Sequence, residues 1–151
     1  MRRRLSALFL FAAAMAFVES AVVVYLRTLY PRRGFSAVSP LIYRTEVLRE
    51  AATILMLLAV AYLAFETLTL RVATFFWTFA VWDVFYYVFL KLLLGWPASL
   101  GTLDVFFLIP VPWVGPVWLP LVLSFAVFIA ASVAFARLPS SRQSGIDEAR
   151  A

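Results

Sequence analysis

The chain has 151 residues, of which 65% are hydrophobic, and its formal net charge is +5. Soluble domains contain roughly 45–50% apolar residues, so this excess indicates a membrane protein. Cysteine and histidine are both missing, which excludes disulfides, thiolate metal sites and histidine-based catalysis. We therefore expect no cofactor and no metal centre, and any chemistry must come from carboxylates, tyrosines, arginines or the single lysine.

The positive charge comes almost entirely from arginines that flank the apolar runs. This placement is typical of membrane topology signals and of contact with anionic lipid headgroups. The arginines do not form a stripe with aromatic residues between them. We therefore expect membrane lipids as partners and no binding to nucleic acid.

The first apolar run covers Leu5–Leu26. About 22 residues rising about 1.5 Å each would cover about 33 Å, which is enough to cross the core of a bilayer. A second interpretation stays open, because Arg2–Arg4, Leu5–Ala13 and Ala14–Ala16 follow the layout of a cleaved signal peptide. The apolar run continues past this segment to Leu26, which favours a membrane span.

Residues 46–70 form the second predicted span, after an arginine-rich first loop. Thr45 is predicted to cap its first turn, where the helix dipole also favours Glu46. At its far end we expect Glu66 and Arg71 to form an ion pair at the membrane interface.

Residues 72–94 form the third predicted span, joined to the second by almost no loop, which indicates an antiparallel neighbour. Asp83 is followed after three, four and eight residues by Tyr86, Tyr87 and Lys91, so these side chains share one broad helix face. The Gly-Trp-Pro stretch at 95–97 is predicted to end this helix.

Residues 98–116 carry Asp104 and several prolines, which make a straight spanning helix implausible. We expect 104–109 to form a short interfacial or re-entrant helix. Residues 117–136 form the fourth predicted span, and 138–151 a polar tail. The predicted fold class is therefore all-α, a polytopic four-transmembrane-helix bundle within residues 1–137 with a short interfacial or re-entrant segment before the last span.

Four spans place both termini on one side of the membrane. Seven arginines would lie on that side and five in the first loop on the other, which favours cytoplasmic termini in a bacterial inner membrane. The first loop is unusually rich in arginine for an outer loop. Either the topology is inverted or these arginines pair with acids, and we adopt the second interpretation.

The ionisable residues of the spans fall at similar depths. Charged groups inside a bilayer cost roughly 2.5–3.5 kcal/mol each, so they are seldom without a role. If the first span ends at Arg27, a rise of about 1.5 Å per residue places the acids of three spans in the outer half of the membrane. We therefore predict a polar pocket there. Its candidate catalytic residues are Asp83, Glu50, Glu19 and Tyr87, and its candidate ligand-binding residues are Tyr86, Lys91, Arg44, Arg49, Trp82 and Asp104.

Three functions stay open for this pocket. It could bind or isomerise a lipophilic ligand such as an isoprenoid or a lipid, with Asp83 or Glu50 as proton donor and aromatic rings stabilising a developing cation. It could instead bind or transport protons, a hard cation or a lipid headgroup; a pore would then require a homo-oligomer, because four helices leave little room for one. In the third interpretation the acids only pair between helices of a structural or accessory subunit.

Three stretches carry a resemblance: WDVFYY at 82–87, GWP at 95–97 and LIPVPWVGP at 108–116. With Glu19-Ser20 and the REAA stretch at 49–52, this pattern resembles a group of small bacterial integral membrane proteins with no assigned activity. The likeness covers roughly the second half of the chain. It implies that the acids and the IPVPW segment belong together, and it brings no catalytic residues.

Overall fold

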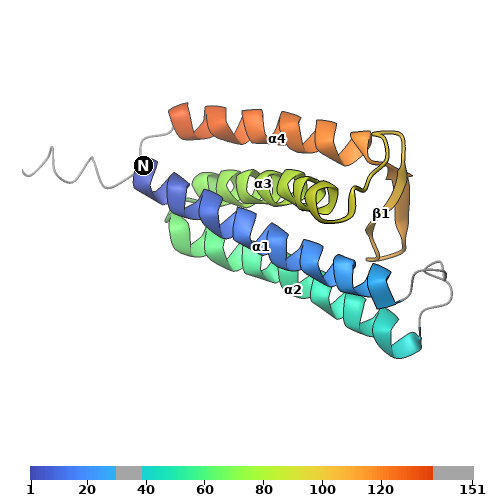
Figure 1. Ribbon diagram of the computed structural model, residues 1–151. Coiled ribbons are helices and arrows are strands. Elements are labelled where there is room, and N and C mark those ends of the chain that lie inside the picture. Colours follow the sequence, from blue (N-terminus) through green and yellow to red (C-terminus); the bar gives the residue numbers. More distant parts are fainter. Residues whose placement is uncertain (30–38, 138–151) are drawn as a thin grey trace, which may run out of the picture.

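The computed structural model describes residues 1–29 and 39–137 of the chain. Its main elements are four long helices that lie side by side and alternate in direction (Figure 1). Each of the four is long and apolar enough to cross a membrane, which confirms the predicted all-α fold with four apolar helices. The predicted polar tail at 138–151 lies outside the described residues. The helices are α1 (Arg2–Leu29), α2 (Pro40–Ala64), α3 (Leu68–Leu94) and α4 (Trp118–Arg137).

Helix α2 begins one and a half turns earlier than predicted. Its N-cap is Ser39, whose hydroxyl accepts a hydrogen bond from the Ile42 amide at 3.3 Å, and Pro40 follows as the first helical residue. Proline suits this position because its missing N–H would have no partner there. The predicted cap at Thr45 is therefore wrong: the Thr45 hydroxyl lies within the helix and donates to the Leu41 carbonyl at 2.9 Å.

Helix α2 is capped at its C-terminal end by Phe65, which adopts an extended conformation, and a short link leads from there to α3. Arg71 stabilises this link: its Nε donates to the Phe65 carbonyl at 2.7 Å, and its guanidinium group lies 3.8 Å from the centroid of the Tyr62 ring. The predicted ion pair between Arg71 and Glu66 is wrong, because the guanidinium satisfies a helix-end carbonyl instead.

Helix α3 ends where the sequence predicts, at Gly95. This glycine has a φ of 67°, and its amide donates to the Lys91 carbonyl at 3.0 Å. A left-handed residue after the last turn is a common helix end that glycine adopts without strain.

The segment after α3 is a β-hairpin, not the short helix predicted at 104–109. Strands β1 (Leu103–Phe107) and β2 (Trp113–Pro116) pair antiparallel, with Asp104 opposite Gly115. Pro110 lies in the turn between them. Proline disfavours a helix, whereas a hairpin satisfies the backbone groups of both strands across the pair.

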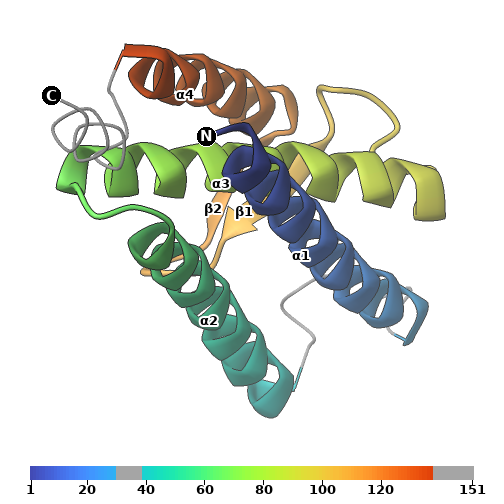
Figure 2. The ribbon, with the colours of Figure 1, turned by 90° about the vertical axis from the view of Figure 1, so that its left-hand side faces the viewer.

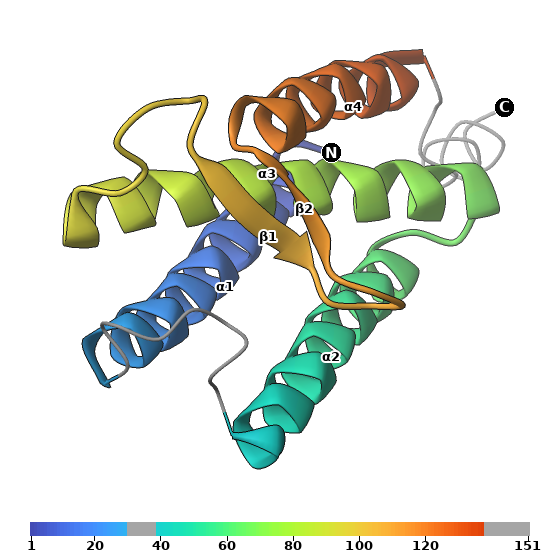
Figure 3. The same cartoon turned by 90° about the vertical axis from the view of Figure 1, so that its right-hand side faces the viewer.

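Helix α3 is the centre of the bundle and packs against α1, α2 and α4. Small side chains such as Ala12 and Ala16 are fully buried on α1, and small residues let helices approach closely. By contrast, α1 and α2 make few contacts with each other. Two opposite views show them standing apart, with the hairpin lying across α3 in the space between them (Figures 2 and 3).

The packing of the hairpin yields a first prediction. A Cβ on Gly115 would lie 2.8 Å from Cε2 of Phe106, so we expect Gly115→Ala to displace this ring and to lower the free energy of unfolding by about 1–3 kcal/mol. Thermal unfolding of the purified protein in detergent would measure the change. The matched control is Gly101→Ala, because the nearest side-chain atom there is 3.7 Å away. Equal stability of the two variants would contradict this packing.

Candidate functional site

A cavity of about 510 Å³ lies between α1, α2, α3 and the hairpin. Its walls combine carboxylates and arginines with apolar side chains such as Val23, Leu26 and Phe106. Eight of the ten residues predicted from the sequence line it. These eight are Glu19, Arg49, Glu50, Trp82, Asp83, Tyr86, Tyr87 and Asp104.

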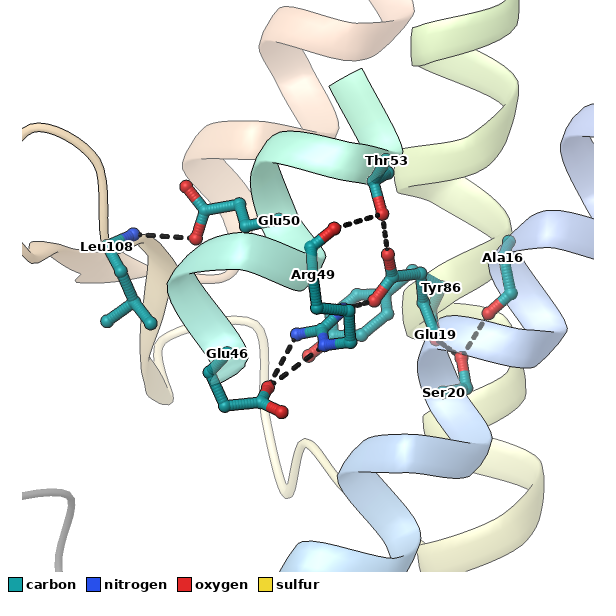
Figure 4. Close-up of polar contacts among 9 residues, drawn as sticks. All are labelled: Ala16, Glu19, Ser20, Glu46, Arg49, Glu50, Thr53, Tyr86 and Leu108. Atoms are coloured by element: carbon teal, nitrogen blue, oxygen red, sulfur yellow. Dashed lines mark hydrogen bonds and ion pairs between the residues drawn. The ribbon is translucent and has the colours of Figure 1, made fainter. Parts of the chain in front are cut away.

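Arg49 connects α1 to α2 on one side of the cavity (Figure 4). Its guanidinium group forms an ion pair with Glu19 of α1, and its Nε and Nη2 donate to Oε2 of Glu46 at 3.0 and 2.8 Å. The Thr53 hydroxyl donates to the other oxygen of Glu19. Both carboxylates are more than 90% buried, so each depends on these donors to offset the loss of hydration.

Glu50 connects α2 to the hairpin. One carboxylate oxygen accepts a hydrogen bond from the Leu108 amide at 2.8 Å (Figure 4), and the other accepts from the Ile109 amide at 3.3 Å. These amides lie at the end of β1, where the hairpin turns and its backbone groups lack a strand partner. The carboxylate therefore fixes the hairpin as one wall of the cavity.

Asp83 connects α3 to α4. Its Oδ2 accepts a hydrogen bond from the Ser124 hydroxyl at 2.8 Å, and both residues are buried. On the opposite side of α3, the Ser20 hydroxyl of α1 lies 3.1 Å from the Tyr86 carbonyl oxygen. Polar contacts thus link α3 to α1 and to α4 at the level of the cavity.

Asp104 of β1 closes the cavity near the end of α3. The Tyr87 hydroxyl donates to its Oδ2 at 3.1 Å, and the Arg27 guanidinium lies 4.0 Å from its Oδ1 and 3.8 Å from the centroid of the Trp96 ring. Burial raises the pKa of Asp104 above its ordinary value of 3.8, although the Tyr87 hydroxyl, the Val105 amide and Arg27 act in the other direction.

Two predicted site residues do not line the cavity. Lys91 points to the end of α3, where its Nζ donates to the carbonyls of Gly95 at 3.1 Å and Pro97 at 2.8 Å. Carbonyls at a helix C-terminus lack intrahelical partners and attract a cation. Arg44 is exposed and lies two residues before Glu46, so it projects from another face of α2. Neither residue supports the predicted ligand-binding role.

Several residues of the site were not predicted from the sequence. Glu46 and Thr53 lie three residues before and four residues after Arg49, so helical spacing could have identified them. Arg27 was treated only as the boundary of the first span. Ser124 gives no signal, because a single serine in an apolar run is common in membrane helices.

The acids of the cavity are all hydrogen-bonded, but not equally. Within the described part of the chain, Asp83 receives one hydrogen bond, from a neutral hydroxyl, whereas Glu19 and Glu46 share a guanidinium group. Asp83 is therefore the acid of the cavity with the fewest hydrogen-bond donors among the described residues. Glu66 does not line the cavity, so the described acids form no continuous path to the other end of the bundle.

No protein-family model, no curated protein and no solved structure matches the chain. The site is therefore interpreted from its own geometry.

The anchor between Glu50 and the hairpin yields the second prediction. Glu50→Ala removes the acceptor of two backbone amides, so we expect faster hydrogen exchange at Leu108 and Ile109 than in the unmodified protein. Hydrogen–deuterium exchange with fragment analysis would measure it. Glu66→Ala is the control, since Glu66 is exposed and distant from the hairpin. Unchanged protection in Glu50→Ala would show that the strand pairing alone holds the hairpin.

Proposed function

We propose that the chain is a multi-pass protein of a bacterial inner membrane, with both termini in the cytoplasm. Four apolar helices support insertion, and so do large side chains on their outer faces, such as Leu10, Leu55, Leu63 and Phe125, each more than 60% exposed. An apolar surface of this extent suits contact with lipid. With the termini in the cytoplasm, the hairpin and the cavity would face the outer leaflet.

The cavity is proposed to bind a lipophilic ligand, in agreement with one of the three functions left open by the sequence. The observation that carries this proposal is the coexistence of acids that are each hydrogen-bonded and an unfilled volume of about 510 Å³ beside them. Pockets for small molecules usually measure about 300–1,000 Å³ and combine apolar walls with a few polar groups. If the acids served only to join helices, the interior between them would be packed with side chains.

The arrangement of α1 and α2 supports a route from the bilayer. Val23 and Leu26 of α1 and Ile42 of α2 line the cavity, and the two helices make few contacts with each other. An apolar chain can reach the polar groups between these helices without crossing water. A membrane lipid or an isoprenoid therefore fits the cavity better than a water-soluble molecule.

Acid–base catalysis on this ligand is a second candidate function, favoured by Asp83. Its carboxyl group has one neutral hydrogen-bond partner, and the aromatic rings of Trp82, Tyr86 and Tyr87 line the same cavity. A carboxylic acid can donate a proton to a ligand, and neighbouring aromatic rings can stabilise the cation that results. Turnover that is lost in Asp83→Asn while ligand binding persists would distinguish catalysis from binding alone.

The third prediction tests ligand binding. Val23→Trp should fill the cavity, so we expect the ligand that co-purifies with the unmodified protein to fall at least tenfold. Native mass spectrometry of the protein purified in mild detergent, without delipidation, would measure bound ligand per protein. Val122→Trp is the control, because Val122 is exposed on α4 and does not line the cavity. Absence of any discrete bound ligand in the unmodified protein, or its retention in Val23→Trp, would contradict the proposal.

A further inference from the structure

The cavity carries more negative than positive formal charge. Its lining contains five carboxyl groups and two guanidinium groups, an excess of three acids. Both arginines are already engaged: Arg49 with Glu19 and Glu46, and Arg27 with Asp104 and the Trp96 ring. Among the cavity-lining residues that the structure describes, phosphate or carboxylate groups of a ligand would therefore meet an excess of acids and no guanidinium group without an acidic partner.

Asp83 and Glu50 have only neutral hydrogen-bond donors. Asp83 is bonded to the Ser124 hydroxyl, and Glu50 to two backbone amides. Neutral donors stabilise a carboxylate but do not cancel its charge. A positively charged group in the cavity beside either acid would lower the electrostatic energy of the site, and it would do so in surroundings where charge interactions are strong.

The Trp82 side chain gives an independent indication of a ligand. Trp82 lines the cavity and is 9% exposed, and its indole N–H is buried without a hydrogen-bond acceptor among the described residues. Buried indole N–H groups usually have a partner, so this donor calls for an acceptor oxygen. The Trp82 ring also stacks on Tyr86 at a centroid distance of 6.4 Å, and the faces of such rings attract cations.

We propose that the ligand of this cavity is an amine-bearing lipid or lipophilic amine, with its ammonium group beside Asp83 and an acceptor oxygen near the Trp82 indole. This inference rests on the proposed ligand-binding function. An organic cation fits better than a metal ion, because no group of three or more acidic residues in the described ranges is arranged to hold a metal. The apolar chain of the ligand would leave between α1 and α2.

The fourth prediction compares three probes of equal chain length: a long-chain 2-amino alcohol, the diol that replaces its amine with a hydroxyl, and the fatty acid. We expect the amino alcohol to bind at least tenfold more tightly than the diol, and the fatty acid more weakly than both. Native mass spectrometry of the delipidated full-length protein would give the apparent dissociation constants.

Charge-neutralising variants test the role assigned to the acids. Asp83→Asn should reduce the tenfold preference for the amino alcohol over the diol to about equal binding of the two, and Glu66→Gln should retain the preference. If Asp83→Asn does not fold, Glu50→Gln removes the other acid that has neutral donors, and it should weaken the amine preference; its single side-chain oxygen can still accept from the Leu108 amide. A preference that survives in the folded variant would overturn the assignment.

The outcomes separate this inference from the function on which it rests. Equal binding of amino alcohol and diol, or tighter binding of the fatty acid, would overturn the amine preference and leave ligand binding intact. Failure of all three probes to bind would count against both.

Discussion

The site depends on one interaction, the bridge that Arg49 makes between Glu19 and Glu46. Two buried carboxylates would each be costly without a cation, and a guanidinium group can bind both through separate N–H groups. Because Glu19 belongs to α1 and Arg49 to α2, the bridge joins two helices that otherwise touch little. The bridge therefore holds α1 and α2 together on one side of the cavity, where the two helices have few other contacts.

The other polar contacts extend the same arrangement outward. Glu50 holds the hairpin against α2, Asp83 binds Ser124 of α4, and Asp104 meets Tyr87 of α3. Four of the five acids of the cavity thus join different pairs of elements, whereas Glu46 pairs with Arg49 of its own helix. The proposal of a ligand rests on the excess of acids in this volume and on the Trp82 indole N–H, which has no acceptor among the described residues.

Much of the fold could be predicted from the sequence, because four apolar runs of sufficient length have few alternatives in a bilayer. Helical rise also indicated that acids from three spans lie near one level, and the cavity contains them. The hairpin was missed because Pro110 and Pro112 exclude a helix without specifying strands, whose pairing depends on contacts made after folding. Lys91 was misplaced because helical spacing does not show that its side chain points along the helix to the carbonyls of Gly95 and Pro97, just after the helix ends.

A double-mutant cycle between Glu19 and Arg49 tests the central claim most directly. Glu19→Gln, Arg49→Met and the double variant would be compared by reversible unfolding in detergent, and the loss of the Glu46 contact cancels because it occurs in both variants lacking Arg49. If the bridge couples α1 to α2, the double variant will be more stable than the sum of the single effects implies, by about 0.5–3 kcal/mol. Strictly additive effects would contradict the account.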